Sequence, residues 1–311
     1  MDLSTFTANS LEAIAGLLLL FFGGEVLVRG AAALAMRLGI SPLAVGLTVV
    51  AFGTSAPELA VSLDAAMAGA NDIAIGNVVG SNIANVALIL GVAALIRPIS
   101  VEPKAVRLDA PLMILCTLVL LAVLRNGVIG RLEGMLLLSG LTAYVAFTLW
   151  QARGHVGESS QGGGDGLPTS LVLITLGLGG IVLGGHLMVE ASIDFALAFG
   201  VSHAVIGLTV VAVGTSLPEL ATSVVAGMRG QGDIAVGNII GSNIFNILGI
   251  VGVTATVTPL TRGAVDWTSL AVMLGAAVVL LPLMLTQHRL ARSEGAGLLL
   301  GYAAYIYWLV V

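Results

Sequence analysis

The sequence is poor in charged residues and has a single cysteine. Only 9% of its 311 residues are Asp, Glu, Lys or Arg, whereas an ordinary soluble domain carries about 25%. This is too little polar surface to cover a water-soluble globule of this length. The net charge of −5 gives no sign of a nucleic-acid partner, and a single cysteine, Cys116, excludes an internal disulfide.

Apolar sequence is abundant instead. Hydrophobic residues make up 58% of the chain, and the mean hydropathy is +1.07. A membrane-spanning helix needs about 20 apolar residues, so this composition predicts an all-α polytopic membrane protein with the lipid bilayer as its partner. The sequence indicates no obligatory protein partner. Ten membrane-spanning helices are predicted, at residues 11–34, 42–68, 73–96, 107–124, 132–151, 170–197, 203–228, 234–259, 266–286 and 292–310.

The ends and the middle of the chain predict its orientation. The first ten residues contain no Lys or Arg, which argues against a cleaved signal peptide and favours a retained first span. A polar, Gly-rich linker at residues 153–169 separates two groups of five spans, 1–152 and 170–311. Loops on the side of this linker hold 8 Lys or Arg against 3 on the other. The positive-inside rule then predicts a cytoplasmic linker and both termini outside, in the cell (inner) membrane.

The two halves contain an internal repeat. Residues 39–85 and 200–246 align without gaps at an offset of 161, with 29 identities in 47 positions. Because each half has an odd number of predicted spans, the second half must start from the opposite side of the membrane. The sequence therefore predicts two inverted five-helix repeats with broken helices at the centre, which is typical of transporters with a substrate site near the membrane midplane.

The stretches "AFGTSAPELAVS" (51–62) and "AVGTSLPELATS" (212–223) place a proline and a glutamate inside apolar segments. Pro57 has no N–H, so the carbonyl of Gly53 loses its helical donor. In hydrocarbon an orphaned carbonyl costs several kcal/mol unless something satisfies it, and a cation can. Thr54 and Glu58 share one helical face, with Ser55 adjacent. Carbonyl, hydroxyl and carboxylate oxygens together are the ligands of a hard cation.

The second repeat copies this arrangement at Ala212, Thr215, Ser216 and Glu219. The span after each stretch adds a serine and an asparagine four residues apart, which therefore share a face and can supply neutral oxygens. These pairs are Ser81 with Asn85, and Ser242 with Asn246. Four neighbouring asparagines are predicted to be interhelical hydrogen-bond donors rather than ligands: Asn77, Asn82, Asn238 and Asn243.

The motifs "GTSAPE" with "GSNIAN", and "GTSLPE" with "GSNIFN", resemble the two alpha-repeats of the sodium/calcium exchanger family. The short linker is similar to that of the prokaryotic branch. The resemblance implies an inverted-repeat exchanger fold in which the first and sixth spans slide across the other eight. It also implies a ligand set drawn from both repeats: Ala51, Thr54, Ser55, Glu58, Ser81, Asn85, Ala212, Thr215, Ser216, Glu219 and Ser242.

Asn246 is the position where the family varies, since potassium-dependent members and some prokaryotic members carry aspartate there. With asparagine, the site holds two carboxylates, Glu58 and Glu219, which balance the charge of one Ca²⁺. We include Asn246 among the ion ligands. Asparagine rather than aspartate at this position argues against potassium coupling. The resemblance implies an antiporter, not an enzyme, that exchanges Ca²⁺ for Na⁺ by alternating access and needs no cofactor. Ca²⁺/H⁺ exchange is the alternative, because a carboxylate in an apolar site can carry a proton.

Two other classes of function fit the sequence less well. The predicted spans show no catalytic Ser–His or paired-Asp constellation of an intramembrane enzyme, and the duplicated carboxylate stretches argue against a non-transporting scaffold. Matched glycine pairs, Gly23/Gly24 and Gly184/Gly185, leave side-chain-free patches on the first and sixth spans. Such patches suit either sliding or close static packing.

Overall fold

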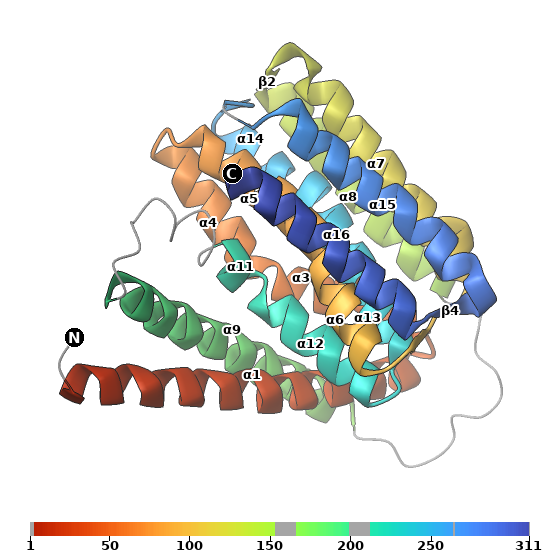
Figure 1. The fold of residues 1–311 in the computed structure, drawn as a ribbon. Coiled ribbons are helices and arrows are strands. Elements are labelled where there is room, and N and C mark those ends of the chain that lie inside the picture. Colours follow the sequence, from red (N-terminus) through yellow and green to blue (C-terminus); the bar gives the residue numbers. More distant parts are fainter. Residues whose placement is uncertain (1–2, 153–165, 199–211, 264, 311) are drawn as a thin grey trace.

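The structure is a computed structural model that describes residues 3–152, 166–198, 212–263 and 265–310. It is a helical bundle with a few two-residue strands at its ends (Figure 1). The predicted linker 153–169 lies mostly outside the described residues, as does the start of the second repeat motif at 200–211. The helices of the first half are α1 (Leu3–Leu38), α2 (Pro42–Val45), α3 (Ala51–Thr54), α4 (Ala56–Met67), α5 (Asn71–Ala84), α6 (Leu90–Ile96), α7 (Ala110–Val123) and α8 (Arg131–Ala152).

The helices of the second half follow the same order where they are described. They are α9 (Leu167–Ala198), α11 (Ala212–Thr215), α12 (Leu217–Met228), α13 (Gly232–Phe245), α14 (Val251–Val257), α15 (Trp267–Leu285) and α16 (Arg292–Val310). Short 3₁₀ turns follow α7 and α15, at Leu124–Asn126 and Thr286–His288.

Both proline–glutamate stretches break their helix at the predicted place. Ser55 separates α3 from α4 with φ −84° and ψ 8°, and Ser216 separates α11 from α12 with φ −89° and ψ 5°. These angles lie in the sparsely populated bridge region. Pro57 and Pro218 stand in the first turn of the helix that follows, where a missing N–H does no harm. The axis bends by 44° between Pro42–Thr54 and Ala56–Met67.

Several helices pass through one π-helical turn, which the sequence did not predict. These turns are Gly46–Val50, Asn85–Ile89, Ala105–Asp109 and Asn246–Ile250. Asn85 and Asn246 each begin a π-helical turn at the same offset of 161. Single π-helical turns widen a helix locally and are frequent at functional sites.

Helices α1 and α9 form a separate layer. They lie side by side along the lower edge of Figure 1, with the remaining helices above them. Two hydrophobic clusters match this division. One, which includes Leu27 and Ile181, joins α1 and α9 to the ends of neighbouring helices, and the larger one fills the rest of the bundle. The α1–α9 pair therefore packs as a unit against the main body.

Short antiparallel strands join the two halves at the ends of the bundle. β1 (Ile99–Ser100) pairs with β4 (Arg289–Leu290), and β2 (Val128–Ile129) pairs with β3 (Leu260–Thr261). Adding 161 to β1 gives β3, and adding 161 to β2 gives β4. Each strand thus pairs with a strand from the other half, so the same contact occurs twice with the halves exchanged.

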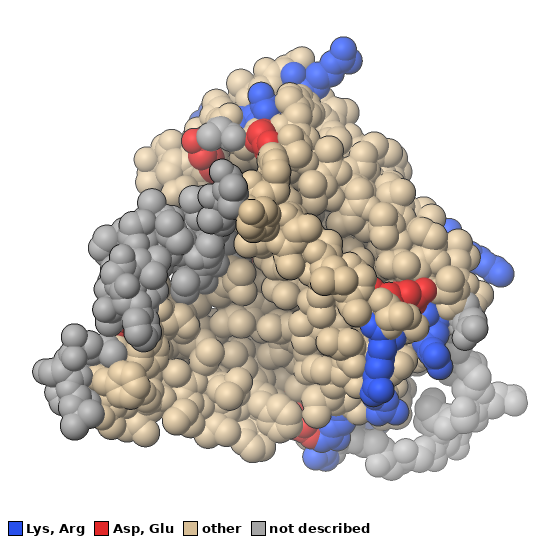
Figure 2. All heavy atoms as spheres, viewed as in Figure 1, with Lys and Arg blue, Asp and Glu red and all other residues tan. Residues whose placement is uncertain are grey.

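The helices have the length and composition of membrane spans. Within the part of the chain that the structure describes, seven are long and apolar enough to cross a bilayer, or up to eight when the bent pair that contains Glu58 is taken as one span. Figure 2 shows charged side chains gathered near the upper margin and at the lower right of the visible face, with a broad uncharged band between them. The chain is therefore a multi-pass integral membrane protein.

Candidate cation site

Two glutamates are buried at the centre of the main body. Glu58 is 1% exposed and Glu219 is 0% exposed. Each lies in the first turn of its helix, directly after the break. The partial positive charge of a helix N-terminus stabilises a carboxylate in that position. The proline therefore does two things: it ends one helix and places a carboxylate at the start of the next.

Hydroxyl groups from one half reach the carboxylate of the other. Ser55 Oγ donates to Glu219 Oε1 at 2.8 Å, and Ser216 Oγ donates to Glu58 Oε1 at 3.1 Å. Ser242 Oγ lies 3.5 Å from Glu219 Oε1, and Ser216 Oγ also lies 3.3 Å from the Oγ of Ser81. The two halves therefore build one site: the Glu219 carboxylate is held from both halves, and the Glu58 carboxylate is held by a serine of the second half.

Four buried oxygen atoms of the predicted ligand residues have no hydrogen-bond partner among the described residues. They are the Oε2 atoms of Glu58 and Glu219 and the Oδ1 atoms of Asn85 and Asn246. All four side chains are at most 1% exposed. Buried acceptors are normally paired, and leaving a charged one unpaired costs several kcal/mol. A hard cation satisfies such oxygens without needing a donor.

The structure brings together most of the residues predicted as ligands. Thr54, Ser55, Ser81, Ser216 and Ser242 are at most 3% exposed. Ala51 begins α3, and its carbonyl oxygen accepts from the backbone N–H of Ser55 at 3.0 Å. Ala212 begins α11 directly after residues that lie outside the described part of the chain. Thr215 is less buried than its counterpart Thr54.

The four asparagines predicted as interhelical donors make such bonds. Asn77 Nδ2 donates to the backbone oxygen of Glu58 at 3.1 Å and to Ser62 Oγ at 2.9 Å. Asn238 repeats both bonds, to the backbone oxygen of Glu219 at 3.4 Å and to Ser223 Oγ at 3.1 Å. The contacts of Asn82 and Asn243 are described below. These bonds fix the backbone of each glutamate against the following helix.

Sequence reasoning missed Ser62 and Ser223. Each follows its glutamate by four residues, and the two are identical at the offset of 161, which is the signal that would have found them. It also missed that Thr54 donates to Asn238 Oδ1 at 3.1 Å, while Thr215 lies 3.5 Å from Asn77 Oδ1. Each threonine thus contacts the asparagine that supports the opposite glutamate.

The donor set is rich in neutral oxygen. Within the described ranges, no group of three or more His, Cys, Asp or Glu side chains is placed to hold a metal ion. Two carboxylates, two amide oxygens and several hydroxyls remain. Such a set suits Ca²⁺ or Na⁺, which take oxygen ligands, better than a transition metal that prefers imidazole or thiolate.

Comparison with known proteins identifies the family. The sequence profile of the family described as "Sodium/calcium exchanger protein" matches residues 11–150 and 169–311. The chain belongs to the sodium/calcium exchanger family. Membership in this family makes it a membrane transporter of the cation/Ca²⁺ antiporter class and confirms the resemblance found in the sequence motifs.

Several proteins align with this family member over nearly the whole length of both chains. It is 38% identical to the putative antiporter CaxA of Alkalimonas amylolytica, over 95% of this chain and 97% of the relative. It is 35% identical to the sodium/calcium exchanger MaX1 of Methanosarcina acetivorans, over 96% and 98% of the two chains. A solved structure of the sodium-calcium exchanger NCX_Mj, soaked with 10 mM Na⁺ and no Ca²⁺, matches with a TM-score of 0.86 at 32% identity. That match covers 97% of this chain and 99% of NCX_Mj.

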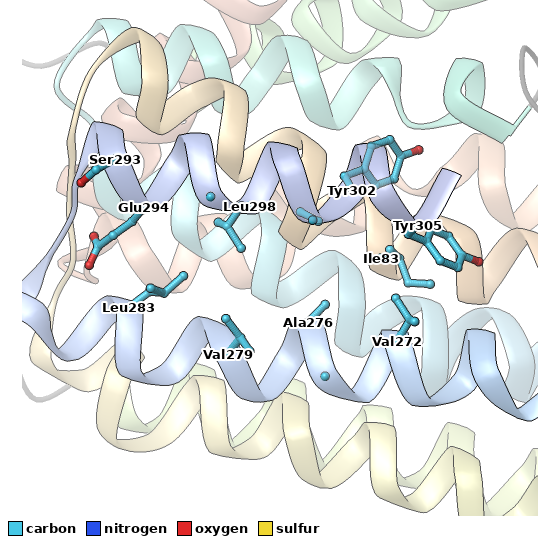
Figure 3. Close-up of a pocket in the computed structure, with 14 residues that line it drawn as sticks. Ile83, Val272, Ala276, Val279, Leu283, Ser293, Glu294, Leu298, Tyr302 and Tyr305 are labelled. Atoms are coloured by element: carbon cyan, nitrogen blue, oxygen red, sulfur yellow. The ribbon is translucent and has the colours of Figure 1, made fainter. Parts of the chain in front are cut away.

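This family member also has a groove away from the two glutamates. It has a volume of about 620 Å³ and lies between α15 and α16, with Ile83 of α5 on its inner wall (Figure 3). Its lining is mostly apolar, for example Val279 and Leu298. The carboxylate of Glu294, at one end, already accepts from Thr286 Oγ1 and from a backbone N–H. The unpaired oxygens at the centre therefore make the better cation site.

Proposed function

We propose that the chain exchanges Ca²⁺ for Na⁺ across the membrane by alternating access. The observation that carries this proposal is the set of four buried oxygens, on Glu58, Glu219, Asn85 and Asn246, that no group in the described ranges pairs with. Two carboxylates balance one Ca²⁺, or two of the Na⁺ ions that replace it. The names of MaX1 and NCX_Mj support sodium as the counter-ion for those relatives, and we extend it to this chain.

The ligands in this proposal are the twelve residues predicted from the sequence. Glu58 and Glu219 carry the charge, and Asn85 and Asn246 present amide oxygens. The hydroxyls of Thr54, Ser55, Ser81, Thr215, Ser216 and Ser242 and the carbonyls of Ala51 and Ala212 complete the set. Asparagine in place of aspartate at position 246 leaves no third central carboxylate for a potassium ion.

The architecture in this proposal is ten spans in two inverted repeats, 1–152 and 170–311, joined by a cytoplasmic linker. Support comes from contacts that occur twice with the halves exchanged, such as Ser55 to Glu219 and Ser216 to Glu58. The two strand pairs repeat in the same way. We place the protein in the cell (inner) membrane with both termini outside, as the loop charges predict.

The direct test is flux in proteoliposomes that contain the purified full-length chain. Vesicles loaded with Na⁺ and diluted into Na⁺-free buffer should take up Ca²⁺ at equal pH on both sides, with a protonophore present. Vesicles given a pH gradient without Na⁺ should not. Uptake driven by the pH gradient alone would instead establish Ca²⁺/H⁺ exchange. Calcium binding without flux under either gradient would contradict antiport.

A further inference from the structure

Four asparagines are joined by hydrogen bonds where α5 and α13 lead into their π-helical turns, and Asn243 Nδ2 also lies 3.4 Å from Met113 Sδ. Asn82 Nδ2 donates to the backbone oxygen of Asn243 at 3.3 Å, and Asn243 Nδ2 donates to the backbone oxygen of Asn82 at 3.4 Å. Asn82 and Asn243 are 2% and 3% exposed. Each stands three residues before a proposed ligand, Asn85 or Asn246, at the start of a π-helical turn.

Two further bonds join each proposed ligand to an asparagine of the other half. Asn246 Nδ2 donates to Asn82 Oδ1 at 2.9 Å, and Asn85 Nδ2 donates to Asn243 Oδ1 at 3.0 Å. An amide carries its two donors on one branch and its acceptor on the other. Anchoring the Nδ2 branch therefore turns the Oδ1 branch the other way. These Oδ1 atoms are the ones with no partner among the described residues.

The polarity of the whole set is imposed by the backbone. A backbone carbonyl can only accept, so the Nδ2 of Asn82 must face the carbonyl of Asn243 and its Oδ1 must face Asn246. Flipping the Asn82 amide would set two oxygens against each other and two N–H groups against each other. The carbonyl thus fixes Asn82, and Asn82 in turn fixes Asn246.

We propose that Asn82 and Asn243 are positioning residues that orient the amides of Asn246 and Asn85, respectively, so that their oxygens face the ions. Each acts on the ligand of the opposite repeat. This inference rests on the proposed function, because it takes Asn85 and Asn246 as ligands. It differs from a purely interhelical role in one respect: the effect of Asn82 on Ca²⁺ affinity must pass through the amide of Asn246.

The test uses the fact that a carboxylate needs no such orientation, since both of its branches end in oxygen. Asn82→Leu should raise the Kd for Ca²⁺ about 10- to 100-fold, the usual loss when a partner that orients a metal ligand is removed. In an Asn246→Asp background, Asn82→Leu should not raise the Kd, because either carboxylate oxygen can face the ion and Asn82 Oδ1 no longer opposes the new carboxyl. Equilibrium binding of radioactive Ca²⁺ to the purified full-length chain measures both, with the unfolding midpoint recorded for every variant.

Two controls separate the possible outcomes. Thr254→Val removes a buried hydroxyl that has no hydrogen-bond partner among the described residues, and should leave the Kd unchanged. Asn246→Ala alone should weaken binding. An unchanged Kd there would overturn the proposed ligand set, and with it the inference. If Asn246→Ala weakens binding but Asn82→Leu weakens it equally with Asp or Asn at position 246, Asn82 has only a structural role and the positioning inference is wrong.

The mirror pair repeats the test independently. Asn243→Leu should weaken Ca²⁺ binding with asparagine at position 85 and have little effect in an Asn85→Asp background. If Asn82→Leu does not fold, this second pair decides the question. Loss of affinity from Asn243→Leu that is undiminished in the Asn85→Asp background would contradict the inference.

Discussion

At the scale of single residues, the two central glutamates should be equally necessary. Each is buried, each starts a helix, and each accepts from a serine of the other half. Glu58→Gln or Glu219→Gln removes half of the charge that faces a divalent ion in a site with little water to compensate. We expect Na⁺-driven Ca²⁺ uptake to fall more than about 100-fold, beyond the loss seen when only a supporting partner is removed.

The control for this prediction is Glu12→Gln, the same chemical change at an exposed position of α1. It should leave Ca²⁺ uptake unchanged in the same proteoliposomes. Near-normal uptake by Glu58→Gln would remove the carboxylate from the ion path and would disprove the assignment of both glutamates, since the two are placed alike.

Asn246→Asp should give Ca²⁺ transport a dependence on pH that the parent lacks. Asparagine and aspartate are nearly isosteric, so packing should survive. The atom facing Asn82 Oδ1 would change from a donor to an acceptor, however, and the 2.9 Å contact would then set two oxygens together. A proton on the new carboxyl relieves this contact. Calcium affinity should therefore rise with pH as that proton leaves and a third negative charge appears.

The measurement is Ca²⁺ flux across roughly pH 6 to 9, the range in which a buried carboxyl of this kind is expected to titrate, with K⁺ present and absent. A response to K⁺ at constant pH would show that a monovalent metal ion, rather than a proton, neutralises the added carboxylate. Identical profiles for the variant and the parent would mean that position 246 does not face the ions.

At the scale of helices, the glycine pairs of α1 and α9 divide between two roles. A Cβ added at Gly23 would meet the backbone N of Ile181 at 2.8 Å, and one at Gly184 would meet the backbone oxygen of Gly16 at 2.7 Å. These two glycines pack α1 against α9. Gly24 and Gly185 instead face α12, where the nearest atoms to an added Cβ belong to Val225 and Pro218. Only the second glycine of each pair lies where the α1–α9 layer would slide.

Cross-linking α1 to α12 should therefore stop transport and spare binding. A Cβ at Gly24 would lie 3.2 Å from Val225 Cγ2, so Gly24→Cys with Val225→Cys, in a Cys116→Ala background, suits a short cross-link. The cross-linked chain should bind Ca²⁺ but lose Na⁺-driven uptake, and reduction should restore it. Unchanged uptake by a verified cross-linked sample would exclude sliding at this contact.

The matched control joins α1 to α9 within the layer. The rings of Phe6 and Phe195 lie 5.7 Å apart, edge to face, so Phe6→Cys with Phe195→Cys can be bridged by the same reagent. This variant should keep transport, because both helices belong to the element proposed to move. If both cross-links stop transport equally, the two helices do not move as one unit.

At the scale of the whole molecule, the sequence predicts the membrane class, the breaks and the repeated carboxylates well. Proline and glycine act locally, so the breaks at Ser55 and Ser216 follow from the sequence alone. The π-helical turns cannot be predicted in this way, because a mostly apolar stretch such as Asn85–Ile89 suits α- and π-helical turns alike. Nor can the crossed contacts between Ser55 and Glu219, because they depend on how the halves meet, which no pattern within one half records.

The proposed inversion of the two halves leads to a prediction about equivalent positions. Val128 in β2 and Arg289 in β4 are related by the offset of 161, and both are exposed. If the halves are inverted, these residues lie on opposite sides of the membrane, and the loop charges place Arg289 in the cytoplasm. Val128→Cys and Arg289→Cys, each in a Cys116→Ala background, should therefore react differently with a membrane-impermeant maleimide applied to intact cells.

We expect the cysteine at position 128 to be labelled from outside, and the one at position 289 to be labelled only after the membrane is opened. Labelling of both from outside, or of both only after lysis, would contradict inverted repeats, because equivalent residues would then share one side. The reverse pattern would keep the inversion but overturn the orientation, and with it the cytoplasmic position of the linker. The two variants thus separate the topology of the fold, which the paired contacts support, from its direction in the membrane, which depends on the loop charges alone.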